Sequence, residues 1–123
     1  MSQNEKSDIR IREAIRVHGD DCVGLRIGVR AVDIIARELA ISEDTRLLKV
    51  RVGTKQCLGD AFKALFHLDD NQLEYAEHDD IIHVTNGTGK IELHLTQRKL
   101  RDANDVLKAS DAELFPVIKK SSN

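Results

Sequence analysis

Three side chains of metal-binding type, His18, Cys22 and Cys57, stand in two short segments of this 123-residue sequence. His18 and Cys22 share the run His-Gly-Asp-Asp-Cys-Val-Gly at residues 18–24, so one tight loop offers an imidazole and a thiolate. Thiolates are soft metal ligands and imidazole is a borderline one. The three side chains therefore form a candidate site for zinc, iron or nickel that leaves one coordination position open.

The predicted position of both cysteines strengthens this reading. Cys22 and Cys57 are each expected at the beginning of a helix, after a loop that contains glycine. Backbone N–H groups and the helix dipole stabilise a thiolate there and lower the pKa of the thiol. Asp20 and Asp60 are candidates for orienting the ligands through hydrogen bonds. A helix cap for Asp20 and a first-turn acid for Asp60 are the alternatives.

The spacing alone leaves simpler explanations open. His-x3-Cys has little specificity by itself, and a buried free cysteine is common in protein cores. The other histidines, His67, His78, His83 and His94, are poorer ligand candidates. We expect His94 on the solvent face of a strand and His78 in a charged, solvated turn.

The predicted elements follow the order helix, helix, strand, helix, a run of three strands and a final helix. Apolar residues form a stripe at helical spacing in the first three helical segments, and they alternate with charged residues in the strand at 47–52. The predicted helices are 9–18 after a cap at Ser7-Asp8, a second helix that begins near Cys22 or Gly24 and extends to 39, 57–66 and 100–114. The predicted strands are 47–52, 73–75, 81–85 and 90–96. Short turns between strands predict an antiparallel sheet covered on one face by helices, an α+β fold. Residues after 114 are expected to form an exposed end.

Length and composition restrict the class of protein. A chain of 123 residues with 41% hydrophobic residues fits one domain over 1–123, with a core at about 9–96 and a carboxy-terminal part at 97–123. A net charge of −2 and 3% aromatic residues argue against a nucleic-acid partner. No apolar stretch is long enough to span a membrane, and the polar amino terminus predicts a cytoplasmic protein. Two cysteines in a reducing compartment are expected as thiols or ligands.

Two segments together resemble the FmdE family, which is named after formylmethanofuran dehydrogenase. Residues 17–31, which begin Val-His-Gly-Asp-Asp-Cys-Val-Gly, are similar to the family's Phe-His-Gly-His-x-Cys-Pro-Gly opening. Cys-Leu-Gly-Asp-Ala-Phe at residues 57–62 resembles the family's Cys-Gly-Val-Asp-Ala-Ile segment. The resemblance extends over about residues 9–96. Asp20 and Val23 stand where the family has His and Pro, so Asp20 is a candidate oxygen ligand.

The resemblance implies a function as well as a fold. It implies a metal- or redox-cofactor-binding protein with His18, Cys22 and Cys57 as ligands and Asp20 and Asp60 beside them. The partner implied is a molybdenum or tungsten oxidoreductase complex of one-carbon metabolism, in which this chain is an accessory subunit or metal-handling factor. The family also implies a homodimer, which a close-packing face at Gly24 and Gly28 would favour.

Two other functions remain open at this point, and whether the chain is an enzyme is undecided. The chain could be a metal-free dimeric interaction module, because several family positions have changed. It could instead be a thiol-dependent enzyme with Cys22 or Cys57 as the nucleophile and His18 as the base.

Overall fold

The computed structural model describes residues 3–19, 21–41, 45–53, 56–76, 80–87, 89–97 and 99–122. The elements in chain order are α1 (Gln3–His18), α2 (Val23–Glu38), β1 (Leu48–Val52), α3 (Gln56–Phe66), β2 (Leu73–Tyr75), β3 (Ile81–Asn86), β4 (Gly89–His94), α4 (Ala103–Lys108), α5 (Asp111–Leu114) and β5 (Val117–Ser122). Among the described residues, no helix combines the length and apolar character needed to cross a bilayer. Helix α1 begins at Gln3, earlier than the predicted cap at Ser7-Asp8.

The strands form a five-stranded sheet in the order β2-β1-β3-β4-β5. β1 pairs with β3, β3 with β4 and β4 with β5, all antiparallel. The pair β1–β2 is parallel, so the expectation of an entirely antiparallel sheet is wrong at this edge. The reason is the crossover through α3, which returns the chain to the same end of the sheet before β2 begins.

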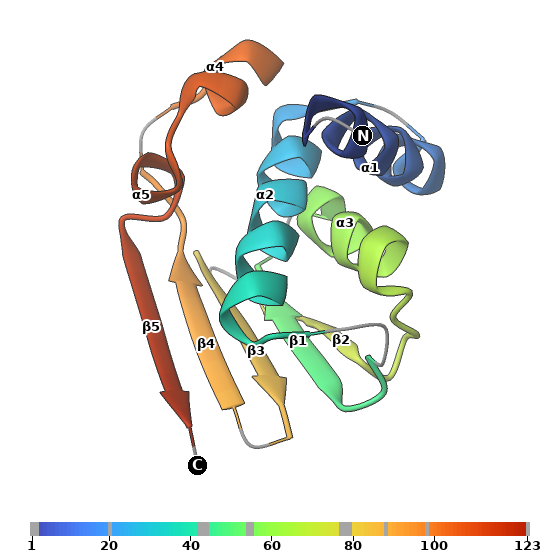
Figure 1. Ribbon diagram of the computed structural model, residues 1–123, viewed down its shortest axis with the longest axis vertical. Coiled ribbons are helices and arrows are strands. Elements are labelled where there is room, and N and C mark those ends of the chain that lie inside the picture. Colours follow the sequence, from blue (N-terminus) through green and yellow to red (C-terminus); the bar gives the residue numbers. More distant parts are fainter. Residues whose placement is uncertain are drawn as a thin grey trace.

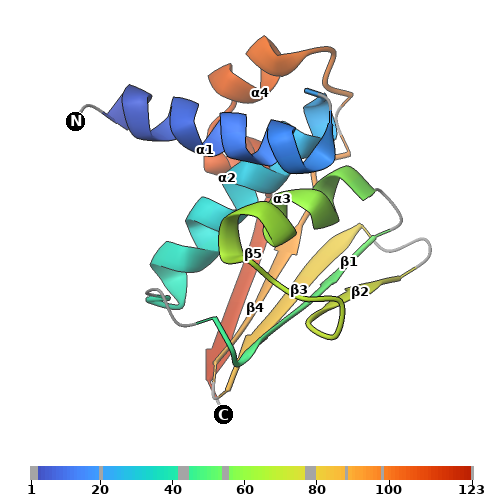
Figure 2. The same ribbon diagram turned by 90° about the vertical axis from the view of Figure 1, so that its right-hand side faces the viewer.

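Helices α2 and α3 cover one face of the sheet with α1 outside them, and the opposite face carries none of the described helices (Figures 1 and 2). The core lies between these layers. It is built almost entirely from aliphatic residues, with Phe62, Phe66 and Phe115 as its aromatic members. The burial of β1 alternates from residue to residue, as a strand with one covered face requires. The α+β fold with helices over one sheet face is therefore confirmed.

Helix α1 packs across α2 and α3 rather than on the sheet. Its Ala14 is fully buried in a second cluster with Leu25 and Val29 of α2 and with Ala61 and Ala64 of α3. The small alanines allow the three helices to approach closely. This cluster fixes the end of α1, where His18 lies, against the beginnings of α2 and α3.

Two glycines bring α2 into contact with α3. A Cβ atom at Gly28 would lie 2.7 Å from Cβ of Ala61, and one at Gly24 would lie 3.0 Å from Cβ of Cys57. Both distances are shorter than an ordinary carbon–carbon contact of about 3.5–4.0 Å. Because α3 of the same chain occupies this face, the face does not support the predicted homodimer.

The carboxy-terminal part differs most from the sequence prediction. The single helix predicted at 100–114 is two helices, because Ala109 is extended and Ser110 is the N-cap of α5, with a capping box to Glu113. The expected exposed end contains β5, which pairs with β4 from His94–Val117 to Gly89–Ser122. Residues 117–122 carry no alternating apolar pattern, because β5 is an edge strand that stays largely exposed.

Candidate metal centre

The ends of three helices bring His18, Cys22 and Cys57 together. One ligand atom from each side chain lies within 4.8 Å of the other two. Nε2 of His18 is 3.3 Å from Sγ of Cys57 and 3.7 Å from Sγ of Cys22. The two Sγ atoms are 3.0 Å apart. The two sequence segments therefore meet at one partly buried point.

His18 is the last residue of α1, and Asp60 of α3 fixes its ring. Gly19 follows with a φ of +93°, a conformation that favours glycine and lets the chain turn toward α2. The Nδ1 atom of His18 lies 2.6 Å from Oδ2 of Asp60, which is buried with 8% of its surface exposed. This carboxylate raises the pKa of His18 above its ordinary value, which burial only partly opposes. A proton held at Nδ1 leaves Nε2 directed at the two sulfurs.

Cys22 lies at the predicted start of α2, where it is the N-cap residue. Its backbone is extended and its Sγ atom accepts a hydrogen bond from the backbone N–H of Leu25 at 3.4 Å. Burial raises the pKa of the Cys22 thiol, but hydrogen bonds with Cys57, Leu25 and His18 outweigh it, so the pKa is below its ordinary value. Of the two cysteines, Cys22 is therefore the one that ionises first.

Cys57 lies in the first turn of α3, one residue after the helix begins. Burial and the neighbouring Cys22 sulfur raise the pKa of Cys57 to about 11. The prediction that both helix-start thiols have a lowered pKa is therefore wrong for Cys57. Two sulfurs in contact cannot both carry a negative charge without a positive ion between them.

The observed distances fit the donor set of a tetrahedral metal. Tetrahedral zinc with sulfur at about 2.3 Å and nitrogen at about 2.05 Å separates sulfur from nitrogen by about 3.6 Å and sulfur from sulfur by about 3.8 Å. The two sulfur–nitrogen distances of 3.3 and 3.7 Å lie on either side of the first value. The sulfur–sulfur distance of 3.0 Å would have to widen by roughly 0.8 Å. Rotation of partly exposed side chains at helix starts can supply that change.

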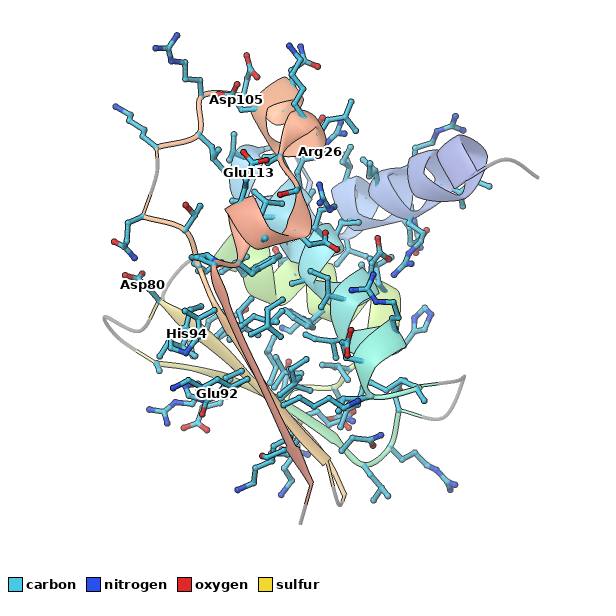
Figure 3. All side chains as sticks on the ribbon, turned by 60° about the vertical axis from the view of Figure 1, so that its left-hand side comes forward. Arg26, Asp80, Glu92, His94, Asp105 and Glu113 are labelled. Carbon is cyan, nitrogen blue, oxygen red and sulfur yellow. The ribbon has the colours of Figure 1, made fainter. Side chains whose placement is uncertain are left out.

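The remaining predicted residues fall into two groups. Asp20 and His78 lie outside the described residues, so their predicted roles are untested. His67 is exposed beyond the end of α3. His83 and His94 alternate with buried core residues in β3 and β4, so both lie on the sheet face opposite the helices, and both approach the carboxylate of Glu92. Figure 3 shows His94 and Glu92 on this face. His94 is on the polar side of its strand as expected, but it is half-buried rather than fully exposed.

Tyr75 lies near the candidate centre, although no motif in the sequence indicates this. The hydroxyl of Tyr75, on edge strand β2, lies against Gly59, where a Cβ atom would be only 2.1 Å from it. Gly59 stands between Cys57 and Asp60, so a phenol lies beside the turn of α3 that bears both site residues. The contact depends on the parallel pairing of β2 with β1, which was not predicted from the sequence.

Comparison with known proteins agrees with the motifs. A search of curated proteins found no match to the chain. The profile described as "FmdE, Molybdenum formylmethanofuran dehydrogenase operon" matches residues 17–71. This range is narrower than the resemblance over residues 9–96, but it contains all four clustered residues, His18, Cys22, Cys57 and Asp60. The segment that builds the centre, residues 17–71, is therefore similar to the FmdE family.

Proposed function

We propose that this chain is an FmdE-like metal-binding protein in which His18, Cys22 and Cys57 hold one transition-metal ion. The observation that carries the proposal is the convergence of these three ligand atoms within 4.8 Å from the ends of three different helices. They come from two segments 35 residues apart, and a family profile spans both. Three protein ligands leave a fourth position for water or a substrate, as in catalytic zinc sites.

The surrounding residues are suited to hold these ligands in place. Asp60 keeps the proton on Nδ1 of His18, so that Nε2 carries the free electron pair. The N-cap position of Cys22 and its bond from Leu25 stabilise a thiolate. A bound metal ion would supply Lewis acidity and the positive charge that lets Cys57 ionise beside Cys22.

The family description points to the setting. The matching profile is named for a molybdenum formylmethanofuran dehydrogenase operon. We therefore propose a cytoplasmic accessory subunit or metal-handling factor that works with a molybdenum or tungsten one-carbon oxidoreductase. The homodimer stays part of this proposal on the family resemblance alone.

Metal analysis tests the ligand assignment. The wild-type chain and the variants Cys22→Ser and Cys57→Ser would be purified without oxygen or chelator, and the metal content per chain measured. We expect about one ion per wild-type chain and a large loss in both variants. Asp21→Asn is a matched control, because Asp21 precedes Cys22 but binds Arg26 instead of the centre. Equal metal content in wild type and in the cysteine variants would refute the assignment.

Thiol catalysis is a second candidate, and one geometric observation favours it. The chain of contacts from Asp60 to His18 to Cys57, at 2.6 and 3.3 Å, has the acid–base–nucleophile order of a triad. It predicts one thiol that alkylates much faster than free cysteine at mildly acidic pH. The raised pKa of Cys57 works against this candidate, and Cys22 would be the faster thiol. A metal-free chain with two slow thiols would favour the interaction module instead.

A further inference from the structure

The distance between the two site sulfurs is intermediate between those of a disulfide and of two thiolates bound to one metal ion. Sγ of Cys22 and Sγ of Cys57 are 3.0 Å apart. A disulfide needs about 2.05 Å, and two thiolates on one tetrahedral metal ion need about 3.8 Å. A change of about 1 Å in the sulfur–sulfur distance would therefore reach either state. Both cysteines are unpaired and only partly buried, so small solutes can reach them.

We propose that Cys22 and Cys57 form a reversible intramolecular disulfide, and that this disulfide excludes the metal from the site. The inference rests on the proposed function, because it assigns a form of regulation to the same three ligands. A sulfur in a disulfide no longer offers a thiolate to a metal. Oxidation thus leaves His18 as one ligand of three, and the ion is released.

The positions of the two cysteines in the fold make intramolecular pairing favourable. Each lies at a helix start, and Gly24 brings the beginning of α2 against Cys57 without an intervening side chain. Close packing of Gly28 on Ala61 holds the same two helices together one turn further along. The sulfur of one cysteine is therefore expected to react with the other cysteine of the same chain faster than with a second molecule.

The oxidant is a low-molecular-weight disulfide, such as oxidised glutathione. The thiolate of one site cysteine attacks it, forming a mixed disulfide and releasing one glutathione thiolate. The second site thiolate then attacks the protein sulfur of the mixed disulfide and releases the second glutathione. The two protein thiols are oxidised by two electrons, and one disulfide is reduced to two thiols. Each thiol that attacks gives its proton to solvent, and each released thiolate takes one up.

The test uses the whole chain loaded with Zn²⁺ and exposed to oxidised glutathione under anaerobic conditions. Three quantities are measured: free thiols, released zinc by a colorimetric indicator, and the cross-linked peptides by mass spectrometry without reduction. We expect both thiols to disappear together, a peptide containing Cys22 joined to one containing Cys57, and release of nearly all the zinc. Dithiothreitol should restore both thiols and zinc binding.

Variants separate this proposal from the metal assignment. His18→Ala keeps both sulfurs and should form the same cross-link, even though it loses the imidazole ligand. Cys22→Ser and Cys57→Ser should carry glutathione on the remaining thiol and form no cross-link. A wild-type chain that forms the cross-link but never binds zinc would support thiol pairing and refute the proposed function.

Three results would overturn the disulfide proposal. They are glutathione adducts on both cysteines of the wild type, disulfide-linked dimers in place of the internal bond, and zinc that stays bound after the cross-link forms. Circular dichroism of each variant would show that the chain is folded, so that a negative result cannot come from unfolding.

Discussion

Replacing Asp60 by asparagine should weaken metal binding while leaving all three ligands in place. Asp60 is buried, and its Oδ2 lies 2.6 Å from Nδ1 of His18. Asparagine has nearly the same shape but carries no charge. Its amide oxygen can still accept the Nδ1 proton, although as a weaker acceptor than a carboxylate. The variant thus isolates the charge-assisted part of the bond that orients His18.

The expected magnitude follows from the role of such partners in metal sites. Loss of a group that orients a ligating histidine costs about 10- to 100-fold in metal affinity, or roughly 1.4–2.7 kcal/mol. Asp60→Asn should therefore raise the dissociation constant for Zn²⁺ by that factor, measured by competition with a chromogenic chelator. In the metal-free chain, the same change should lower the pKa of His18, measured by NMR titration, because the hydrogen bond to Asp60 is what raises it.

Asp21→Asn is the matched control. It removes the same charge beside Cys22, but Asp21 is exposed and its carboxylate binds Arg26 at 2.8 and 2.9 Å. We expect zinc affinity to be unchanged within error in this variant. Equal weakening in both variants would mean that only the net negative charge matters. Unchanged affinity in Asp60→Asn would refute the orienting role of Asp60.

Three further predictions concern stability. Gly28→Ala should lower the free energy of unfolding by about 1 kcal/mol. Overpacking against Ala61 costs about 1–3 kcal/mol, and the higher helix propensity of alanine offsets about 1 kcal/mol of this. Thermal unfolding would show a midpoint roughly 4 °C lower, and adding Ala61→Gly should restore part of the loss specific to this contact. The proposed disulfide spans 35 positions and should raise the free energy of unfolding of the oxidised chain by up to about 4 kcal/mol in denaturant titrations. An unchanged free energy of unfolding would refute a native-like cross-link. In the metal-free chain, the stability advantage of wild type over Asp60→Asn should be fully present below about pH 6.5 and be lost as pH rises through the raised pKa of His18. An advantage that grows with pH would contradict this sign.

The parts of the fold that could be predicted from the sequence are those with strong local patterns. Helix α2 follows from its apolar spacing, and the pairing of β3 with β4 follows from the short glycine-containing turn between them, where Gly87 has a positive φ. The parallel pairing of β2 depends on how α3 crosses the sheet, which no local pattern encodes. The division between α4 and α5 could have been predicted, because Ser-Asp-Ala-Glu at residues 110–113 has the sequence of a capping box.

The sequence predicted four side chains that lie together in the structure, but it did not predict their electrostatics. The motifs identified His18, Cys22, Cys57 and Asp60, and the structure brings all four together. The opposite pKa shifts of the two thiols could not be predicted, because they arise from direct contact between the sulfurs across two helices. The contact of Tyr75 with Gly59 likewise depends on tertiary packing alone.

The most direct test of the metal centre is a titration of the reduced, metal-free chain with Co²⁺, followed by absorption spectroscopy. Cobalt bound by thiolates in a tetrahedral site gives sulfur-to-metal charge-transfer bands and intense visible bands. We predict that these bands saturate at one Co²⁺ per chain, weaken in Cys22→Ser and in Cys57→Ser, and vanish when both substitutions are combined. A wild-type chain without charge-transfer bands, or a doubly substituted chain that keeps them, would contradict a metal held by His18, Cys22 and Cys57.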